Sequence, residues 1–417
     1  MKKVDIVVVG GGPAGLAAAI KAKKEKIDSI LLIERDEELG GILNQCIHNG
    51  FGLHTFREEL TGPEYANRYI KMFLEAKIEY KLETIVLNIT QDKILTIMNP
   101  QEGIFQVQAK AIILAMGCRE RPRGSLNIPG YRPSGIFTAG TAQRLINMEG
   151  QMPGKEVVIL GSGDIGLIMA RRMVLEGAKV RMVAELMPYS SGLNRNIVQC
   201  LNDFDIPLRL SHTITKIYGK DRVEGVDIGK VDENFNLVEG SEIYIPCDTI
   251  LLSCGLIPEN ELSKDMGVDL DPITRGPVVS DDLMTNVEGV FACGNVLHVH
   301  DLVDFVSEEA AKAGHFAAEY IKNSKKSRDD MILTKAGNRL RYIVPKYIRK
   351  HGKEDIILRF RVDDVYRDKY ISIYRDGECI YHKKKRFFAP AEMESLKLRR
   401  SEINENNKIF EITLEDD

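Results

Sequence analysis

Residues 4–15 read VDIVVVGGGPAG, and the pattern of this segment predicts the fold. Val4–Val9 is short, β-branched and almost wholly apolar, which is typical of a strand buried in a parallel sheet. Gly10–Gly15 follows with the spacing GxGxxG, and the run LAAAIKAKK behind it predicts a helix. A strand, a glycine turn and a helix in this order favour binding of a nucleotide pyrophosphate, because the glycines admit the phosphates and the helix N-terminus attracts them.

A second predicted strand, Ser29–Ile33, ends in Glu34 and is followed by Arg35. A carboxylate about 20 residues beyond the glycine turn can accept hydrogen bonds from the two hydroxyls of a ribose. The first nucleotide site is therefore expected to use the glycine turn and the end of this strand. Its candidate residues are Gly10, Gly12, Pro13, Ala14, Gly15, Glu34 and Arg35.

The same pattern recurs at residues 156–166, which read EVVILGSGDIG and precede another predicted helix and strand. The first glycine and the terminal acid lie 24 positions apart in both copies, Gly10 to Glu34 and Gly161 to Glu185. An internal repeat of this kind predicts two nucleotide-binding units. The candidate residues of the second site are Gly161, Gly163, Asp164, Ile165, Gly166 and Glu185.

Glu185 also bears on the choice of nucleotide. A carboxylate beside the ribose repels the 2′-phosphate of NADP(H), so the second site is expected to prefer NAD(H). Three nearby arginines, Arg171, Arg172 and Arg181, weaken that preference. The alternative is that the second unit serves only as a packing scaffold and binds no nucleotide.

The chain of 417 residues is long enough for two or three domains, and its 44% apolar and 28% charged residues are ordinary for a globular protein. A net charge of −4 gives no reason to expect a nucleic acid or an anionic membrane as partner. The seven cysteines include no CxxC pair, which argues against a disulfide framework and favours the reducing cytoplasm. No segment approaches the ~20 apolar residues of a transmembrane helix.

The last part of the chain differs from the rest. Residues 325–417 hold 23 Lys and Arg against 17 Asp and Glu, a net +6, which leaves −10 on the first 324 residues. Residues 331–417 alternate apolar and polar side chains around a hairpin turn at Asp376–Gly377, and they predict a small β-rich domain. Its basic surplus, including Lys383–Arg386, predicts a solvated face and an edge strand protected from aggregation, with docking of an acidic partner as the alternative.

Two further strands complete the pattern. Ala111–Arg121 reads AIILAMGCRER, and Glu288–Val296 reads EGVFACGNV with a helical run behind it. Together with the two glycine turns, these motifs resemble the two-dinucleotide-domain flavoproteins of the pyridine nucleotide–disulfide oxidoreductase superfamily. The resemblance covers about residues 1–325. It adds as cofactor-binding candidates Gly41, Ala115, Gly117, Gly255, Gly294 and Asn295.

The resemblance implies an α/β fold with two Rossmann-like domains, in which FAD occupies the first glycine turn and NAD the second. The FAD domain would comprise residues 1–120 and 260–325, with the NAD domain, 121–259, inserted in it and the β-rich domain at 331–417. Asn295 stands where the family usually has aspartate, and its amide oxygen can still accept a ribityl hydroxyl. The helix behind Asn295 would direct its N-terminus at the flavin pyrimidine ring.

In the disulfide reductases of this superfamily, the loop after the ribose acid carries two cysteines. Here residues 40–52 read GGILNQCIHNGFG, with Leu43 and His48 at those positions and Cys46 between them. A single thiol cannot close the local disulfide, and the chain has no His-Pro dipeptide for the family's acid–base element. Reduction of a disulfide by the usual relay is therefore not expected.

By the same resemblance, three side chains are catalytic candidates: Cys46, His48 and His300. An imidazole near a flavin can move protons, although His48 can equally be a structural histidine. Cys46 is either a thiolate beside the flavin or a small packed residue, and packing is favoured. Acid–base or substrate contact is expected around His300 and a metal is not, because no third ligand is evident. The other members of that polar cluster are His298, Asp301 and Asp304.

The segments 188–214 and 294–304, with the loop 40–52, narrow the resemblance to flavoproteins encoded beside dehydrogenases. They include a companion of an FAD-dependent glycerol-3-phosphate dehydrogenase and subunits of opine, proline and cyanide-forming dehydrogenases. The resemblance implies the NADH-linked subunit of a multi-component dehydrogenase, whose partner in a homo- or hetero-oligomer is a flavoprotein or iron–sulfur protein. The alternatives are an electron-transfer or structural subunit without its own small substrate, and a direct amine or polyol dehydrogenase.

Overall fold

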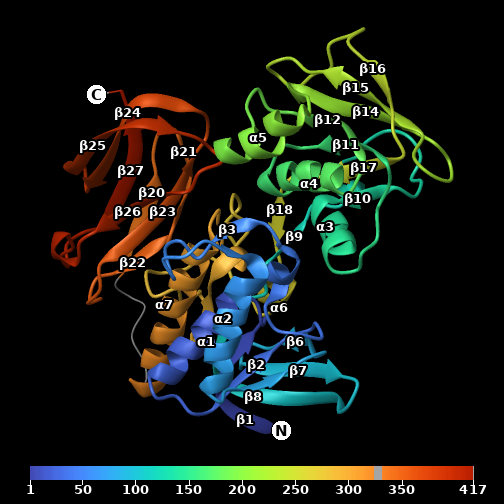
Figure 1. Cartoon of the computed structure of the whole chain (residues 1–417). Helices are drawn as coiled ribbons and strands as arrows, with labels where there is room; N and C mark the ends of the chain where they lie inside the picture. Colours follow the sequence, from blue (N-terminus) through green and yellow to red (C-terminus); the bar gives the residue numbers. More distant parts are fainter. Residues whose placement is uncertain (324–330, 417) are drawn as a thin grey trace. The chain divides into compact units, whose positions relative to one another are not determined.

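The structure, a computed structural model, describes residues 1–323 and 331–416 (Figure 1). The chain divides into two compact units. The first comprises Met1–Asn44, Asn49–Cys118 and the chain from Pro258 onward, and the second comprises Gln45–His48 and Arg119–Ile257. No helix within the described ranges is long and apolar enough to cross a membrane.

The central sheet of the first unit is built on β1 (Lys2–Val9), the strand predicted from its apolar run. Its parallel neighbours are β2 (Ile30–Ile33) and β8 (Gly103–Leu114), and β19 (Val290–Ala292) runs parallel to β8. The carboxyl ends of these four buried strands therefore meet at one edge of the sheet. The remaining strands before residue 118 are β3 (Asn49–Phe51), β4 (Leu60–Thr61), β5 (Glu79–Lys81), β6 (Ile85–Ile89) and β7 (Ile94–Asn99).

Three helices of this unit lie together in Figure 1: α1 (Pro13–Lys24), α2 (Gly62–Glu75) and α7 (Val303–Lys322). The buried face of α1 is made of alanines with one leucine and one isoleucine, so α7 can approach its backbone closely. At the crossing, a Cβ on Gly314 would lie 2.1 Å from the carbonyl oxygen of Ala18. A short helix, α6 (Glu261–Asp265), completes the set.

The second unit repeats the design with a five-stranded parallel sheet in the order β10-β17-β11-β12-β13. The predicted strand at 156–160 is β11, and the predicted helix behind the second glycine turn is α4. The bounds are β10 (Ile136–Thr138), β11 (Glu156–Leu160), β12 (Lys179–Glu185), β13 (Leu208–Leu210), β17 (Thr249–Leu252), α3 (Ala139–Asn147), α4 (Asp164–Leu175) and α5 (Asn194–Cys200). An antiparallel sheet adds β14 (His212–Tyr218), β15 (Gly225–Lys230) and β16 (Ile243–Pro246). The chain enters and leaves this unit through the paired strands β9 (Cys118–Glu120) and β18 (Leu256–Pro258).

The C-terminal strands form two sheets around a separate apolar core. One sheet has the order β22-β20-β27-β24-β25 and the other β21-β23-β26. The predicted turn at Asp376–Gly377 joins β24 to β25, with positive φ at both residues. The bounds are β20 (Met331–Ala336), β21 (Leu340–Val344), β22 (Tyr347–Arg349), β23 (Ile356–Val362), β24 (Tyr366–Arg375), β25 (Glu378–Phe388), β26 (Glu394–Leu398) and β27 (Ile409–Glu415).

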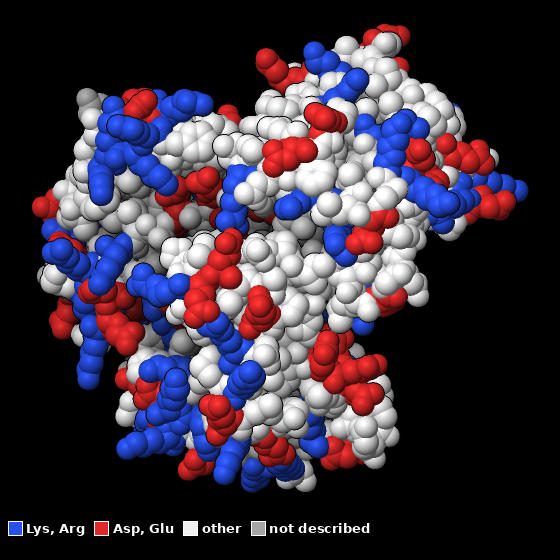
Figure 2. All heavy atoms as spheres, in the orientation of Figure 1, with Lys and Arg blue, Asp and Glu red and all other residues white. Residues whose placement is uncertain are grey.

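Part of the basic surplus of the C-terminal strands is neutralised within the chain. Arg349 and Arg400 both pair with Asp281, at 2.9 Å and 2.6 Å, and the Asp281 side chain is only 3% exposed. The segment Lys383–Arg386 is exposed on β25, which is an edge strand, and Figure 2 shows basic side chains gathered over β24 and β25. Buried arginines therefore account for part of the +6, while the edge-strand cluster faces solvent as expected.

The chain behind Asn295 differs from the expectation. Instead of entering a helix at once, it makes a short 3-10 turn, Gly294–Val296, and α7 begins only at Val303. The Asn295 side chain explains part of this delay, because its Oδ1 accepts the backbone N–H of His300 at 3.0 Å and folds the loop back. The N-terminus of α7 therefore lies beyond a loop that contains His298 and His300.

The first glycine turn yields a stability test. Alanine normally favours a helix over glycine, but at position 15 its Cβ would lie 1.8 Å from the carbonyl oxygen of Gly10. Gly15→Ala should therefore lower the free energy of unfolding by about 1–3 kcal/mol, measured by urea denaturation. Gly124→Ala is the control, since no atom lies within 4 Å of its Cβ. Equal urea midpoints for the two variants would show that a Cβ at position 15 does not destabilise the fold.

Candidate functional site

The first glycine turn is shaped for a pyrophosphate. Gly10 has φ +107°, and a Cβ there would lie 2.4 Å from the carbonyl oxygen of Ala115. A Cβ on Gly12 would meet only the Cα of Gly41, at 3.9 Å, so this position borders open space. Helix α1 begins at Pro13 without a side-chain cap on Gly12, which leaves its first N–H groups for an anion.

The glycine-rich loop of residues 40–52 passes beside this turn. Gly41 has φ +57°, and its Cβ would lie 2.9 Å from the Cα of Gly12. The loop forms a 3-10 turn at Gly41–Gln45, in which Leu43 is buried. Glycine at position 41 is therefore required both by the backbone conformation and by the close approach.

Glu34, at the end of β2, retains capacity for a ligand. It is 6% exposed, and it accepts the N–H of Gly11 at 2.6 Å on Oε2 and that of Asp36 at 2.9 Å on Oε1. A carboxylate has about four acceptor positions, so about two stay open for a ribose diol. Arg35, the next residue along the chain, is exposed.

The second glycine turn has the same backbone features. Gly161 has φ +96° with its Cβ position 2.1 Å from the carbonyl oxygen of Ser253, and Gly166 packs against the Ser253 side chain. Helix α4 also begins without a side-chain cap, on Gly163. Asp164, one of the candidate residues, accepts hydrogen bonds on Oδ1 from Leu193 N at 2.8 Å and Asn196 Nδ2 at 2.7 Å. Its carboxylate holds the loop before α5.

Glu185 is more heavily occupied than Glu34. Its Oε2 accepts from Ser162 N at 2.8 Å, Ser162 Oγ at 2.6 Å and Ser191 Oγ at 3.2 Å, and its Oε1 accepts from Met187 N at 3.0 Å. About one acceptor position, on Oε1, remains for a ribose hydroxyl. Glu185 therefore connects the segment 187–191 to the second glycine turn through hydrogen bonds.

Gly117 and Gly255, two of the cofactor-binding candidates, follow β8 and β17. Gly117 has φ +71° and Gly255 has φ +97°, and neither has another atom within 4 Å of its Cβ position. Their carbonyl oxygens accept the N–H groups of Glu259 and Arg121 respectively. Both glycines therefore serve the change of chain direction at the ends of β9 and β18.

The end of β19 lies against the first glycine turn. Gly294 has φ +71°, and its Cβ would lie 2.9 Å from the Cβ of Ala14. Its N–H donates to Oε1 of Glu309 at 2.9 Å. The neighbouring Asn295 accepts from His300 N, which leaves a second lone pair on its amide oxygen for a ligand hydroxyl.

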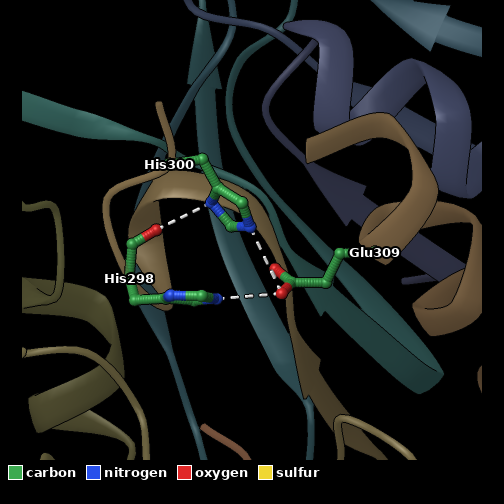
Figure 3. Close-up of side chains that lie close together, drawn as sticks. All are labelled: His298, His300 and Glu309. Carbon is green, nitrogen blue, oxygen red and sulfur yellow. Dashed lines mark hydrogen bonds and ion pairs between the residues drawn. The ribbon is translucent and has the colours of Figure 1, made fainter. Parts of the chain in front are cut away.

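A buried carboxylate on α7, Glu309, joins the two histidines behind β19 (Figure 3). Its Oε2 lies 2.9 Å from His298 Nε2, 3.3 Å from His300 Nε2 and 2.9 Å from Arg359 Nη1. The side chains are 2%, 0%, 1% and 7% exposed for Glu309, His298, His300 and Arg359. Although burial alone would raise the pKa of Glu309, His300 and His298 hold it well below its usual range, so Glu309 is a carboxylate.

The two histidines differ in their contacts. Burial, followed by the neighbouring His300, lowers the pKa of His298 to about 4, so His298 is neutral and donates its Nε2–H to Glu309. Its Nδ1 is buried and has no hydrogen-bond partner among the described residues. His300 Nδ1 lies 2.9 Å from the carbonyl oxygen of His298, and its Nε2 faces Glu309. The Nε2 of His300 lies at ion-pair distance from Glu309 Oε2, 3.3 Å, without the geometry of a hydrogen bond.

These three side chains have the spacing of a metal site, because their ligand atoms lie within 4.8 Å of one another. The guanidinium of Arg359 already contacts the carboxylate oxygen that both imidazoles share, and it would repel a divalent cation. Asp301 and Asp304, grouped with the histidines from the sequence, have other partners. Asp304 accepts from Gly52 N and Thr55 N, while Asp301 pairs with Arg361 and accepts from Met393 N.

Cys46 and His48 belong to the second unit, whereas His300 belongs to the first. Burial raises the pKa of the Cys46 thiol to about 12, so it is protonated at neutral pH. Burial, with a smaller effect of Arg195, lowers the pKa of His48 to about 4, which makes this imidazole neutral. Gln45 anchors the segment on α3, donating to Gly140 O and to Gln143 Oε1, both at 3.0 Å.

Sequence reasoning did not identify Glu309 or Arg359. A signal for Glu309 was present, since it lies on the apolar face of α7 that also buries Val306, Ala310 and Ala313. A carboxylate on such a face requires a buried partner. Arg359 carries no comparable signal, because its partner lies 50 positions away in the chain.

Residues 4–317 match the model of the family described as pyridine nucleotide-disulphide oxidoreductase. One of the opine oxidase subunits of Agrobacterium tumefaciens is 25% identical over 312 residues, covering 70% of this chain and 61% of that protein. The HcnB subunit of the hydrogen cyanide synthase of Pseudomonas protegens is 27% identical over 284 residues, covering 63% of this chain and 59% of that protein. The chain thus spans about three fifths of these relatives.

Among solved structures, the thioredoxin reductase of T. acidophilum superposes with a TM-score of 0.63 at 24% sequence identity. The superposition covers 76% of this chain and 99% of that one. At this identity the likeness concerns the fold, and it confirms the α/β class that the resemblance implied.

The lowered pKa of His298 sets a dependence of stability on pH. Between about pH 6.5 and pH 4 the unfolded histidine binds a proton that the folded one does not, so stability falls as pH falls, by on the order of 3 kcal/mol. Because the pKa of Glu309 is lowered in the folded protein, its protonation causes a further loss of stability at lower pH. Urea midpoints measured from pH 7 to pH 4.5 should show this slope. His298→Gln should flatten it, whereas His351→Gln, at an exposed histidine, should not; equal slopes in the two variants would contradict the assignment.

Proposed function

Since the chain belongs to the pyridine nucleotide-disulphide oxidoreductase family, we propose that it is an oxidoreductase exchanging a hydride between NAD(H) and bound FAD. The family binds FAD and NAD(P). The observation that carries the proposal is the pair of uncapped glycine turns, each followed by a buried acid, Glu34 and Glu185. FAD, once bound, supplies the group that accepts and releases the hydride.

The first site supplies the features that FAD needs. The open space at Gly12 admits a pyrophosphate, the N–H groups of α1 face it, and Glu34 keeps acceptor positions for the adenosine ribose. Gly294 and Asn295 stand at the neighbouring strand end, where Asn295 Oδ1 can accept a ribityl hydroxyl. These contacts would bind and orient the cofactor.

The second site is proposed to prefer NAD(H). Glu185 is a buried acid at the expected ribose position, and its charge repels a 2′-phosphate. Since Ser162, Ser191 and Met187 occupy most of its acceptor positions, its contact with the ribose would be a single hydrogen bond. Discrimination would then come mainly from repulsion of NADP(H), with little gain in affinity for NAD(H).

His300 is the proposed acid–base group of the flavin site. It lies in the loop behind β19, with Nδ1 2.9 Å from the carbonyl oxygen of His298 and Nε2 3.3 Å from Glu309, and an imidazole in this position can move protons. His48, neutral at physiological pH, is proposed as a proton acceptor or a structural group. Cys46 is proposed to pack and not to react, because a thiol with a pKa of about 12 is a poor nucleophile at neutral pH.

The relatives lead to a further proposal, that the chain works as one component of a multi-component enzyme. The two relatives described above are subunits, one of an opine oxidase and one of a hydrogen cyanide synthase. The partner would be a dehydrogenase flavoprotein or an iron–sulfur protein. One candidate is a glycerol-3-phosphate-type complex, and the alternative is a component that passes electrons without its own small substrate.

Anaerobic bleaching of the flavin tests these proposals. NADH should bleach the purified holoprotein at least tenfold more efficiently than NADPH, and glycerol 3-phosphate should bleach it only after a partner protein is supplied. Gly12→Val should abolish flavin binding, whereas Gly163→Val should keep the flavin and lose the response to NADH. No bleaching by either nucleotide would contradict hydride exchange, and preference for NADPH would contradict the role of Glu185.

Alkylation tests the assignment of Cys46. At pH 8 iodoacetamide should modify the exposed Cys379 and leave Cys46 unmodified in the folded protein, as read by peptide mass spectrometry. Cys46→Ser should retain NADH-driven dye reduction within about twofold, and no disulfide substrate should be reduced. Rapid alkylation of Cys46 with loss of activity would show that this thiol is catalytic.

A further inference from the structure

Two arginines of the C-terminal strands reach the loop behind β19. Arg359 and Arg361 lie two residues apart on β23, so their side chains leave the same face of the strand. Arg359 Nη1 donates to Glu309 Oε2 at 2.9 Å. Arg361 donates to Val299 O at 3.1 Å and pairs with Asp301. Both arginine side chains are largely buried, at 7% and 13% exposure, so these contacts belong to the interior.

Arg359 sets the charge of the network around Glu309. One carboxylate oxygen faces three groups that can carry a positive charge: His298, His300 and Arg359. A guanidinium keeps its proton at every physiological pH, so Arg359 is the fixed cation of the three. Because the carboxylate is neutralised by that cation, the imidazole of His298 need only donate an N–H and need not become charged.

We propose that Arg359 is a positioning residue, through which the C-terminal strands keep His298 a neutral hydrogen-bond donor to Glu309. The proposal rests on the proposed function for one point, that the first glycine turn and β19 hold the flavin. It assigns a role to the C-terminal strands, because the fixed cation of the site comes from β23 and not from a nucleotide-binding sheet.

The charges around Glu309 predict how removal of Arg359 would change the pKa of His298. Without the guanidinium, Glu309 is a buried carboxylate that requires another cation, and His298 at 2.9 Å is placed to take up a proton. Arg359 is one of the groups that lower the pKa of His298, after burial and His300. The other titratable or charged groups around this network are Cys293, Asp301, Glu308, Lys312, Tyr342 and Arg361.

A second arginine of the C-terminal strands offers a matched control. Arg400 also reaches a buried acid earlier in the chain, pairing with Asp281 at 2.6 Å, but its contacts do not include Glu309. Arg400→Met removes a comparable ion pair and reports what loss of such a pair alone does. Arg359→Lys keeps the positive charge with a different shape, whereas Arg359→Met removes the charge.

The experiment follows the histidine rings of the ¹⁵N-histidine-labelled holoprotein by NMR from pH 5 to pH 8, with assignments from His298→Gln and His300→Gln. In the wild-type protein His298 should stay neutral across this range. Arg359→Met should raise the midpoint of His298 from about 4 into this range, and Arg359→Lys should restore it. Arg400→Met should leave it unchanged even where both variants lose similar thermal stability.

Three results would overturn the proposal: titration of His298 in the wild-type protein, equal shifts in Arg359→Met and Arg400→Met, or one equivalent of a bound divalent metal that His300→Gln removes. The pH profile of NADH-driven bleaching gives a second readout, which Arg359→Met should change and Arg400→Met should not. If NADH bleaches no variant, including the wild-type protein, the proposed function fails, whereas the NMR titration still decides the role of Arg359.

Discussion

In each nucleotide-binding unit a helix packs on the strand before it so closely that no Cβ fits between the two backbones. The other features of the fold are built on this contact. A Cβ on Gly15 would lie 1.8 Å from the carbonyl oxygen of Gly10, and one on Gly166 would lie 2.9 Å from that of Gly161. The same close approach therefore occurs in both units. It brings an uncapped helix N-terminus to the edge of each parallel sheet, where the strand ends converge.

The two copies have the same spacing but use their acids differently. Glu34 accepts two backbone N–H groups and keeps about half of its acceptor positions, whereas Glu185 is occupied by two serines and two backbone N–H groups. The first acid is therefore free to recognise a ligand, and the second is largely engaged in holding its own loop. A permanently held cofactor and an exchanging one place different demands on an acid at this position.

Charge connects the C-terminal strands to the nucleotide-binding fold. Basic residues in the C-terminal part of the chain exceed the acidic ones by six, and several arginines of this surplus are buried against acids that precede it in the chain. Buried ion pairs contribute little to stability, because desolvation offsets most of their attraction, but they fix geometry and proton states. At Glu309 this arrangement joins the end of β19, two histidines and β23 through one carboxylate.

The features that depend on neighbours along the chain could be predicted from the sequence alone. They are the strand–turn–helix order, the internal repeat, the hairpin at Asp376–Gly377 and the family. These features arise from local periodicity and from backbone conformations that only glycine adopts easily. Only the tertiary structure shows which groups pair with Asp164, Glu185, Glu309 and Arg359. Pairing of buried charges depends on which distant segments meet, and no local pattern records that Arg359 lies 2.9 Å from a carboxylate 50 residues before it.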